Sequence, residues 1–384
     1  MIEKKDIVAT YNLPREVKFC SRCVVSNQRP RITFDQENVC SACRYSERKS
    51  RDIDWRKREE ELLRVLDRFR SKDGSHDVIV PCSGGKDSSF VAYQLKYKYD
   101  MNPLTVTWSP HIYTDIGRQN LRNFIDSGFD NILGTANGKI HRLLTKLAFI
   151  HLGDPFQPFI YGQKAFPLRI ATTFNIPLIM YGEDGEAEYG GEVKDGRQMH
   201  NFDEDLYKHY FSGIGPEYWL KYGIEKKEIS VYLPPQYIEM KKAGPECHFM
   251  GYYKKWTPQE NYYCAAEHTG FMANPDGRSE GTYSKYASLD DKIDGFHYYL
   301  MFIKFGIGRA TSDAAHEIRD GHLTRGEGVQ LVRKYDGEFP KKYFKDFLDY
   351  CGITEQEFWD VIDSWRSPHV WEKAGGEWKL KFRI

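Results

Sequence analysis

The sequence predicts an α/β fold, in which a doubly wound parallel sheet follows an N-terminal zinc ribbon and precedes a helical C-terminal part. Two observations predict it. From Asp77 onward, short apolar segments alternate with segments of helical periodicity, the pattern of a parallel sheet with crossover helices. Before them, four cysteines form two C-x-x-C pairs. The expected strands are 77–82, 104–108, 131–133 and 177–181, and the expected helices are 87–98, 117–127 and 138–151.

The cysteine pairs are Cys20 with Cys23 and Cys40 with Cys43, and sixteen residues separate the pairs. Each C-x-x-C forms a tight turn that directs two thiolates at one metal, so the spacing favours a zinc ribbon. A disulfide is disfavoured in a reducing compartment, while a redox dithiol and an iron–sulfur cluster are alternatives. Because four sulfur ligands leave tetrahedral zinc no open position, we expect a structural role.

A serine- and glycine-rich turn, Ser83-Gly-Gly-Lys-Asp-Ser88, ends the first expected strand and opens the first expected helix. Gly84 and Gly85 lack a Cβ, so their backbone can bring N–H groups close to an anion. Ser83 and Ser88 add hydroxyl donors, and the helix directs its positive dipole end to the same place. We interpret the turn as a phosphate-binding loop, with an ordinary strand-to-helix turn as the alternative.

A second turn, Gly182-Glu-Asp-Gly-Glu-Ala-Glu-Tyr-Gly-Gly191, follows the last expected strand. The carboxyl ends of parallel strands meet at one edge of a sheet, so we expect this turn to lie near the phosphate-binding loop. Its acids predict a magnesium site made by Glu183 and Glu186 together with Asp87. The turn resembles the G-E-G-S-D-E-L-F-G-G turn of the asparagine synthetase synthetase domain, from which Ala187 departs by losing a carboxylate. An acidic solvent loop is the alternative.

The chain has 384 residues, enough for two or more structural units. Its 55 Lys and Arg balance its 55 Asp and Glu, which disfavours a nucleic-acid partner. The first residues lack the apolar core of a signal peptide, and no later run is apolar for long enough to cross a bilayer. We therefore expect a cytoplasmic protein with no membrane partner.

We divide the chain into five parts. These are the zinc ribbon, a charged amphipathic connecting helix, the sheet core, an insertion or lid that interrupts the alternation, and a substrate-binding helical part. Their ranges are 1–50, 51–73, 74–190, 191–270 and 271–384. Cations in the last part are candidates to clamp a phosphate or a carboxylate. The substrate-binding candidates are Arg278, Tyr283, Lys285, Lys292, His297, Lys304 and Arg309.

The motif Ser83–Ser88 resembles the S-G-G-x-D-S loop of the PP-loop ATP pyrophosphatases. With the cysteine pairs, the acidic turn and the segments 287–299 and 304–311, the chain resembles the N-acetyl sugar amidotransferase family from about Cys20 to Asp336. The resemblance implies a PP-loop ATPase fold of the adenine nucleotide alpha hydrolase type that binds ATP, Mg²⁺ and Zn²⁺. It implies ATP-binding residues Ser83, Gly84, Gly85, Lys86, Asp87, Ser88, Trp108 and Gly182, and catalytic residues Lys86, Asp87, Glu183 and Glu186.

The resemblance also implies an activity, the ATP-dependent conversion of the acetamido group of a sugar or nonulosonic acid to an acetamidino group. The amide oxygen would be adenylylated and then displaced by ammonia, in bacterial surface-glycan biosynthesis such as that of LPS O-antigen, capsule or flagellin glycan. Residue 2 is Ile where a class II glutaminase needs Cys, and no nucleophile elbow surrounds Cys82. We therefore expect a separate glutaminase and a cyclase-like ammonia-channel subunit as partners.

The principal alternative is a PP-loop tRNA thiolase or another RNA-modifying enzyme that adenylylates an oxygen. It would need a catalytic cysteine beside the nucleotide, for which Cys82, Cys247 and Cys264 are candidates. It would also need a basic RNA-binding face, which the balanced charge disfavours. A zinc-ribbon scaffold that binds ATP as a regulator is a further alternative, and it predicts no release of AMP.

Overall fold

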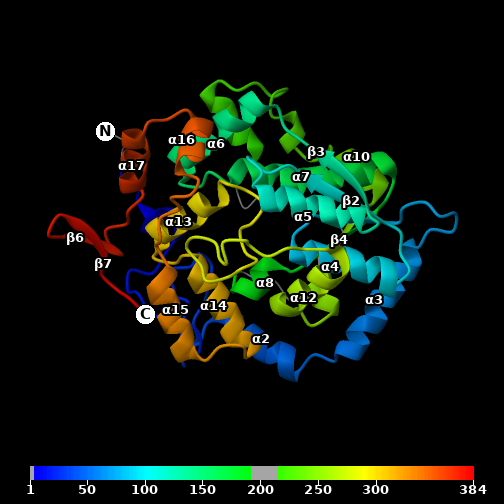
Figure 1. The fold of residues 1–384 in the computed structure, drawn as a ribbon, viewed down its shortest axis with the longest axis horizontal. Helices are drawn as coiled ribbons and strands as arrows, with labels where there is room; N and C mark the ends of the chain where they lie inside the picture. The colour runs from blue at the N-terminus through cyan, green and yellow to red at the C-terminus, as the bar shows by residue number, and fades with distance from the viewer. Residues whose placement is uncertain (1–3, 192–213) are drawn as a thin grey trace.

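The computed structural model describes residues 4–191 and 214–384. A five-stranded parallel sheet occupies one half of the molecule, with the strand order β3-β2-β1-β4-β5 (Figure 1). The order reverses at β1, which places a topological switch point between β1 and β4. The four expected strands are present, within two residues of their predicted ends. The strands are β1 (Val78–Pro81), β2 (Pro103–Trp108), β3 (Asp130–Gly134), β4 (Leu178–Tyr181) and β5 (Glu246–Phe249).

Both faces of the sheet are buried against helices. Val78 and Val80 pack with α3, α4 and α5, while Ile79 points to the opposite face and packs with α6 and α7. This double coverage explains why the strands read as nearly continuous apolar runs. It confirms the predicted α/β parallel sheet. The helices are α3 (Trp55–Phe69), α4 (Lys86–Tyr93), α5 (Asp115–Asp126), α6 (Gly138–Leu152) and α7 (Gln157–Phe174).

Three features of this half differ from the sequence prediction. The expected helix 87–98 is α4 followed by a π-helical turn, Gln94–Lys98. Helix α7 was not expected, because Pro167 in its interior interrupts the helical pattern. Strand β5 falls within the stretch 191–270 that we interpreted as an insertion or lid, yet it pairs along the length of β4. Part of that stretch therefore completes the sheet.

The remaining described helices on the sheet side are short, apart from α12, which packs against α4. Within the described part of the chain, no helix is both long enough and apolar enough to span a membrane. The elements are α8 (Gly185–Tyr189), α10 (Tyr237–Ala243), α11 (Met250–Tyr253), α12 (Pro258–Thr269) and the 3₁₀ turns Pro216–Tyr222 and Ser230–Tyr232.

The cysteine-containing N-terminal segment and the C-terminal helices form a second unit beside the sheet (Figure 1). They share one core, in which Val24 and Val39 lie in the same cluster as Phe296 and Phe347. Two isolated antiparallel bridges, Phe19↔Ser26 and Phe34↔Cys40, replace the longer hairpin expected of a ribbon. The helices are α1 (Ile7–Tyr11), α2 (Ser41–Arg51), α13 (Asp294–Phe305), α14 (Arg309–Asp320), α15 (Arg325–Tyr335), α16 (Phe344–Cys351) and α17 (Glu355–Ser364).

The C-terminal part is helical as expected up to α17, but it ends in an antiparallel hairpin of β6 (Trp371–Ala374) and β7 (Glu377–Leu380). The expectation of helix there was wrong. Gly375 and Gly376 both have positive φ, 63° and 85°, as a two-residue hairpin turn requires. The Gly-Gly pair between two aromatic-containing segments was the signal of this hairpin.

Candidate active site

The turn from Ser83 to Ser88 leads directly from β1 into α4. Gly84 has φ 79°, and a Cβ on it would lie 2.6 Å from the Cα of Leu121, so only glycine fits this position. Gly85 is the N-cap of α4 and supplies no capping side chain. The amides of the first turn of α4 are therefore available to an external acceptor.

The acidic turn after β4 lies against this loop, as the strand order predicts. A Cβ on Gly182 would lie 3.9 Å from the Cβ of Asp87 and 2.9 Å from the ring of Trp256, so the two chain segments approach closely. Asp87 Oδ2 accepts from Lys86 Nζ at 2.5 Å, and its Oδ1 accepts from Asn261 Nδ2 of α12 at 3.0 Å. Lys86 and Asn261 thus fix the Asp87 carboxylate at the mouth of the loop.

Glu183 is the second carboxylate of this site. Burial and the neighbouring Asp87 carboxylate raise the pKa of Glu183, while His316 and Lys86 act in the opposite direction. A hard divalent cation between the two carboxylates would relieve their repulsion, so Asp87 and Glu183 have the chemistry of a magnesium site. Glu186 lies on α8, but its side chain is outside the described part of the structure.

The segment from Lys285 to Asp294 reaches the loop from the C-terminal part. Lys86 Nζ lies 5.2 Å from the ring centroid of Tyr286, and Tyr286 stacks on Tyr262 with centroids 5.0 Å apart. Lys285 Nζ lies over that second ring at 4.7 Å. Two lysines therefore approach one aromatic platform beside the loop.

Asp290 connects the same segment to the loop itself. Burial, reinforced by Asp294 and Asp291, raises the pKa of Asp290 to about 6, although a hydrogen bond from Ser83 acts to lower it. Its backbone lies so close to Gly117 of α5 that a Cβ there would come within 2.4 Å of the Asp290 Cα. The C-terminal part is thus in direct contact with the Ser83–Ser88 loop.

Arg309 is the first residue of α14, a helix that packs against α8 of the acidic turn. Tyr283 lies next to the same helix. Arg309 Nε donates to Asp313 Oδ1 at 3.0 Å, and the guanidinium also donates to the hydroxyl of Tyr298. Burial opposes the charge of Arg309, but Asp313 together with Tyr298, Tyr189 and Asp294 outweighs burial and raises the pKa of this side chain well above its usual value. Tyr283 donates to Glu317 Oε2 at 3.1 Å.

Four other substrate-binding candidates form hydrogen bonds with residues outside the candidate active site. Arg278 forms two hydrogen bonds with Glu338. The remaining pairs are Lys292 with Asp346 at 2.8 Å, His297 with Asp154 at 2.8 Å, and the buried Lys304 with Tyr11 and the Leu152 carbonyl at 3.4 Å each.

Trp108, which the resemblance suggested for ATP, is buried at the end of β2. Its ring packs so tightly on α7 that a Cβ on Gly162 would lie 1.9 Å from the indole. It contacts the rings of Phe166 and Tyr232 in the core beneath the sheet. The structure therefore places this indole in the core and not in an open cleft.

The four cysteines form a compact group that could bind a metal ion such as zinc. All four sulfur atoms lie within 4.8 Å of one another, with Cys20 to Cys43 at 3.9 Å and Cys23 to Cys40 at 3.7 Å. Sulfur atoms at the corners of a tetrahedron around zinc are about 3.8 Å apart for a Zn–S bond of about 2.3 Å. The backbone amides of Arg22 and Cys40 donate to Cys20 Sγ, as in metal knuckles. These residues fit the metal.

The three cysteines considered as nucleophiles lie in environments that favour the neutral thiol over the thiolate. Burial raises the pKa of Cys82 to about 11 and that of Cys247 to about 12. Burial also raises the pKa of Cys264. A thiol with a raised pKa is a weak nucleophile at neutral pH, so these cysteines lack the activation that thiolate chemistry needs.

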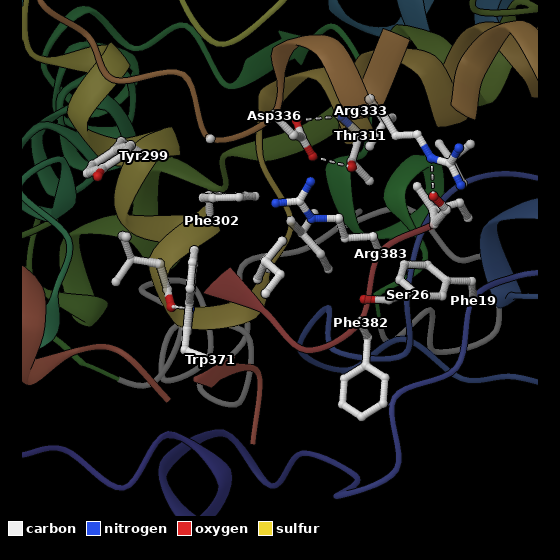
Figure 2. Close-up of a pocket in the computed structure, with 18 of the residues that line it drawn as sticks. Phe19, Ser26, Tyr299, Phe302, Thr311, Arg333, Asp336, Trp371, Phe382 and Arg383 are labelled. Carbon is white, nitrogen blue, oxygen red and sulfur yellow. Dashed lines mark hydrogen bonds between the residues drawn. The ribbon is translucent and has the colours of Figure 1, made fainter. Parts of the chain in front are cut away.

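A separate cavity of about 330 Å³ lies between the C-terminal hairpin, α13 and the cysteine-containing segment. Figure 2 shows Arg383 extending into it beside Phe302, and Asp336 hydrogen-bonded to Thr311. Phe19 contributes to its wall. Among the described residues that line this cavity, none belongs to the candidate active site.

A comparison with protein families gives an independent indication. Residues 280–383 match the family model of the C-terminal domain of WbpG-like LPS biosynthesis proteins. This WbpG-like segment contains Tyr286, Asp290 and Arg309 of the candidate active site. The match supports a role in surface-polysaccharide biosynthesis. Comparison of the chain with curated proteins found no match.

Several residues of the site were not among the predicted ones. Asn261, Tyr286 and Asp290 all contact the loop or its residues, as described above. Asp290 lies in the segment Ala287–Tyr299, which was singled out for its resemblance, so its position was within reach of the sequence. Asn261 donates a hydrogen bond to Asp87, which is 174 positions away in the chain, and no local sequence pattern predicts such a contact.

Proposed function

We propose that the protein is an ATP-dependent amidotransferase that converts the acetamido group of an N-acetylated sugar or nonulosonic acid into an acetamidino group. The observation that carries the proposal is the meeting of the Ser83–Ser88 loop, which carries Asp87, with the turn that carries Glu183, at the switch point of the sheet. The WbpG-like segment supports a substrate of the sugar class, because its family model describes LPS biosynthesis proteins and the segment contains Asp290 and Arg309. AMP and pyrophosphate would be the products of ATP.

The reaction divides into two steps. The amide oxygen of the acetamido group attacks the α-phosphorus of ATP, and the bond from that phosphorus to the bridging oxygen of pyrophosphate breaks. Ammonia then attacks the activated carbon, the carbon–oxygen bond breaks, and AMP leaves with the former amide oxygen. The nitrogen loses a proton as the C=N bond forms, and the basic amidine takes up a proton from water. The neutral acetamido group thereby becomes a cation.

Residues of this chain would hold the reacting groups. The amides of the first turn of α4, with the hydroxyls of Ser83 and Ser88, would donate hydrogen bonds to the pyrophosphate oxygens. Asp87 and Glu183 would hold Mg²⁺, which neutralises the leaving pyrophosphate. Lys86 would add positive charge to the same place. Arg309 and its neighbouring tyrosines, Tyr298 and Tyr283, would bind the sugar.

The test is to incubate the pure protein with ATP, Mg²⁺, ammonium and a panel of N-acetylated nucleotide sugars and nonulosonic acids. Mass spectrometry should show replacement of one oxygen by NH, with one AMP formed per product. Formation of ADP in place of AMP, or of AMP without the oxygen-to-NH exchange, would contradict the proposal. Glutamine alone should not replace ammonium, because the nitrogen is expected from a separate glutaminase through a cyclase-like channel subunit.

The RNA-modifying alternative is distinguished by the cysteines. Alanine substitution of Cys82, Cys247 and Cys264 should leave amidotransfer intact, whereas a thiolase would lose all activity with its nucleophile. The raised pKa of each of these thiols favours the amidotransferase.

A further inference from the structure

A buried ion pair joins the cysteine-containing segment to the acidic turn of the candidate active site. Lys49 of α2 donates to both carboxylate oxygens of Glu188 on α8, at 2.6 and 2.7 Å. The two side chains are only 8% and 5% exposed. His316 of α14 contacts Glu188 Oε2 at 3.3 Å from the other side. A carboxylate so fully desolvated is held in one position by these partners.

Helix α2 is itself part of the cysteine site. Its N-cap is Cys40 and its first turn contains Cys43, so two of the four sulfur ligands fix the start of the helix. The N-terminal end of α2 also contacts the end of α8, because Ser41 Oγ donates to the Gly190 carbonyl at 3.0 Å. A Cβ on Gly190 would lie 3.0 Å from that hydroxyl, which shows how closely the two segments pack.

Arg319 of α14 forms a second connection. Its guanidinium donates to the Glu188 carbonyl at 2.9 Å. Its carbonyl accepts from Ser46 Oγ of α2 at 3.3 Å. Arg319 therefore links the end of α8 to the helix that begins at Cys40.

These contacts fix the C-terminal end of the acidic turn, at Glu188 and Gly190. The N-terminal end of the same turn carries Glu183, which is catalytic in our proposal. Glu183 begins the turn beside Asp87, α8 follows at once, and Glu188 and Gly190 end it against α2. Displacement of α2 would remove Lys49 and Ser41 from the end of α8. That end would then be held from α14 alone, so the distance between Glu183 and Asp87 would be less closely fixed.

We propose that metal binding at the four cysteines positions the acidic turn 183–190, and that Lys49, Glu188 and Arg319 are the positioning residues that transmit it. The contacts described above support the coupling between the cysteine site and the turn 183–190. The consequence of this coupling for nucleotide binding rests on the proposed function. Because coupling between two sites is reciprocal, weakening the Lys49–Glu188 pair should also weaken retention of the metal.

The first experiment measures hydrogen exchange with no nucleotide or sugar present. Removal of Zn²⁺ from the full chain with a chelator should increase exchange of the amides of 183–190, while amides of the central strand β1 stay protected. Unchanged exchange in 183–190 after the metal has left would overturn the proposal. Loss of protection throughout the sheet would also overturn it, because the effect would then be global unfolding.

The second experiment uses variants of α2 and α8. Lys49→Met should increase the rate of Zn²⁺ release to a colorimetric chelator about tenfold, within the range typical of coupled sites. Arg51→Met is the matched control, since Arg51 is on the same helix and 76% exposed, and it should release Zn²⁺ at the wild-type rate. Equal release rates in the two variants would contradict the coupling.

A double variant keeps the test informative if Lys49→Met folds poorly. Lys49→Met with Glu188→Met removes both charges, so the fold should recover while the specific contact stays absent. We expect fast exchange in 183–190 in this folded variant, and wild-type protection there would overturn the proposal. These readouts do not involve ATP, so the coupling and the amidotransferase activity can fail separately.

Discussion

At the scale of single residues, the site depends on one glycine that no other residue can replace. Gly84 combines a positive φ, which strains any other residue, with an approach to the backbone of α5 so close that it leaves no room for a Cβ. The sequence predicted a glycine requirement there because the loop must bring amides to a phosphate. The contact with Leu121 came only from the structure.

Gly84→Ala should therefore abolish nucleotide binding. The left-handed conformation costs a non-glycine residue about 1–2 kcal/mol, and the contact at 2.6 Å with Leu121 forces the loop to move as well. We expect the Kd for Mg-ATP, measured by calorimetry, to rise more than about tenfold. Gly74→Ala is the control, since Gly74 has φ 84° with no atom within 4 Å of the added Cβ. An affinity loss of equal size in Gly74→Ala would attribute the effect to backbone strain alone.

Glu183 is a residue at which stability and function should oppose each other. Its raised pKa means that the folded state favours the protonated acid, so its contribution to stability is present at low pH and lost as pH rises above the usual carboxyl range. Glu183→Gln should thus raise the Tm at pH 7 by about 1–3 °C and lower AMP formation by about 100-fold.

The same variant tests the magnesium site. Mg²⁺ with a non-hydrolysable ATP analogue should stabilise the wild type against heat more than it stabilises Glu183→Gln. Glu60→Gln, at a half-exposed position of α3, should behave as the wild type. If Mg²⁺ shifts all three Tm values equally, Glu183 is not a ligand.

At the scale of elements, the success of the sequence prediction depended on how each element satisfies its polar groups. Strands β1, β2 and β4 are buried and almost wholly apolar, with only Thr105 and Thr107 of β2 as polar exceptions, and they were found from the sequence. Strand β5 was missed because it contains His248 and Glu246. Their polar atoms are satisfied by Tyr253 and Arg68, partners that only the tertiary structure supplies. The pairing of Lys49 with Glu188 was beyond prediction for the same reason.

The cluster around α14 should give the protein a measurable pH dependence. Burial lowers the pKa of His316, but Asp320 and Glu188 outweigh it and raise the pKa to about 9. A raised histidine pKa contributes stability that is fully present below the unfolded value of about 6.5 and lost as pH rises through about 9. The neighbouring cations Lys49 and Arg319 oppose this charge, so we expect at most about 3 kcal/mol.

Urea unfolding at several pH values checks this expectation. The free energy of unfolding of His316→Gln should lie below that of the wild type at pH 6.5, and the two should converge near pH 9. His322→Gln is the control, because His322 is exposed at the end of the same helix. A difference that stays constant from pH 6.5 to 9 would show that His316 is not protonated in the folded protein.

At the scale of the whole molecule, the candidate active site lies where three parts of the chain meet. The sheet supplies the loop and Glu183, the C-terminal part supplies Asp290 and Arg309, and the cysteine-containing segment fixes the end of the acidic turn at Glu188. The predicted zinc ribbon and the predicted substrate-binding part are therefore not separate units in the structure, since these two parts share one core.

This shared core predicts that the WbpG-like segment is not an independent folding unit. Residues 280–384 alone would expose the faces that bury Val24, Val39 and Phe149 in the full chain. Each such side chain contributes about 1.5–3 kcal/mol when buried, and a typical domain has only about 5–15 kcal/mol of stability. Arg325, which donates to the Cys20 and Cys23 carbonyls, would lose both acceptors.

Expressed alone, the segment 280–384 should show no cooperative thermal transition by circular dichroism, whereas co-expression with 1–279 should restore one. A cooperative transition in the isolated segment would show that it folds without the cysteine-containing segment.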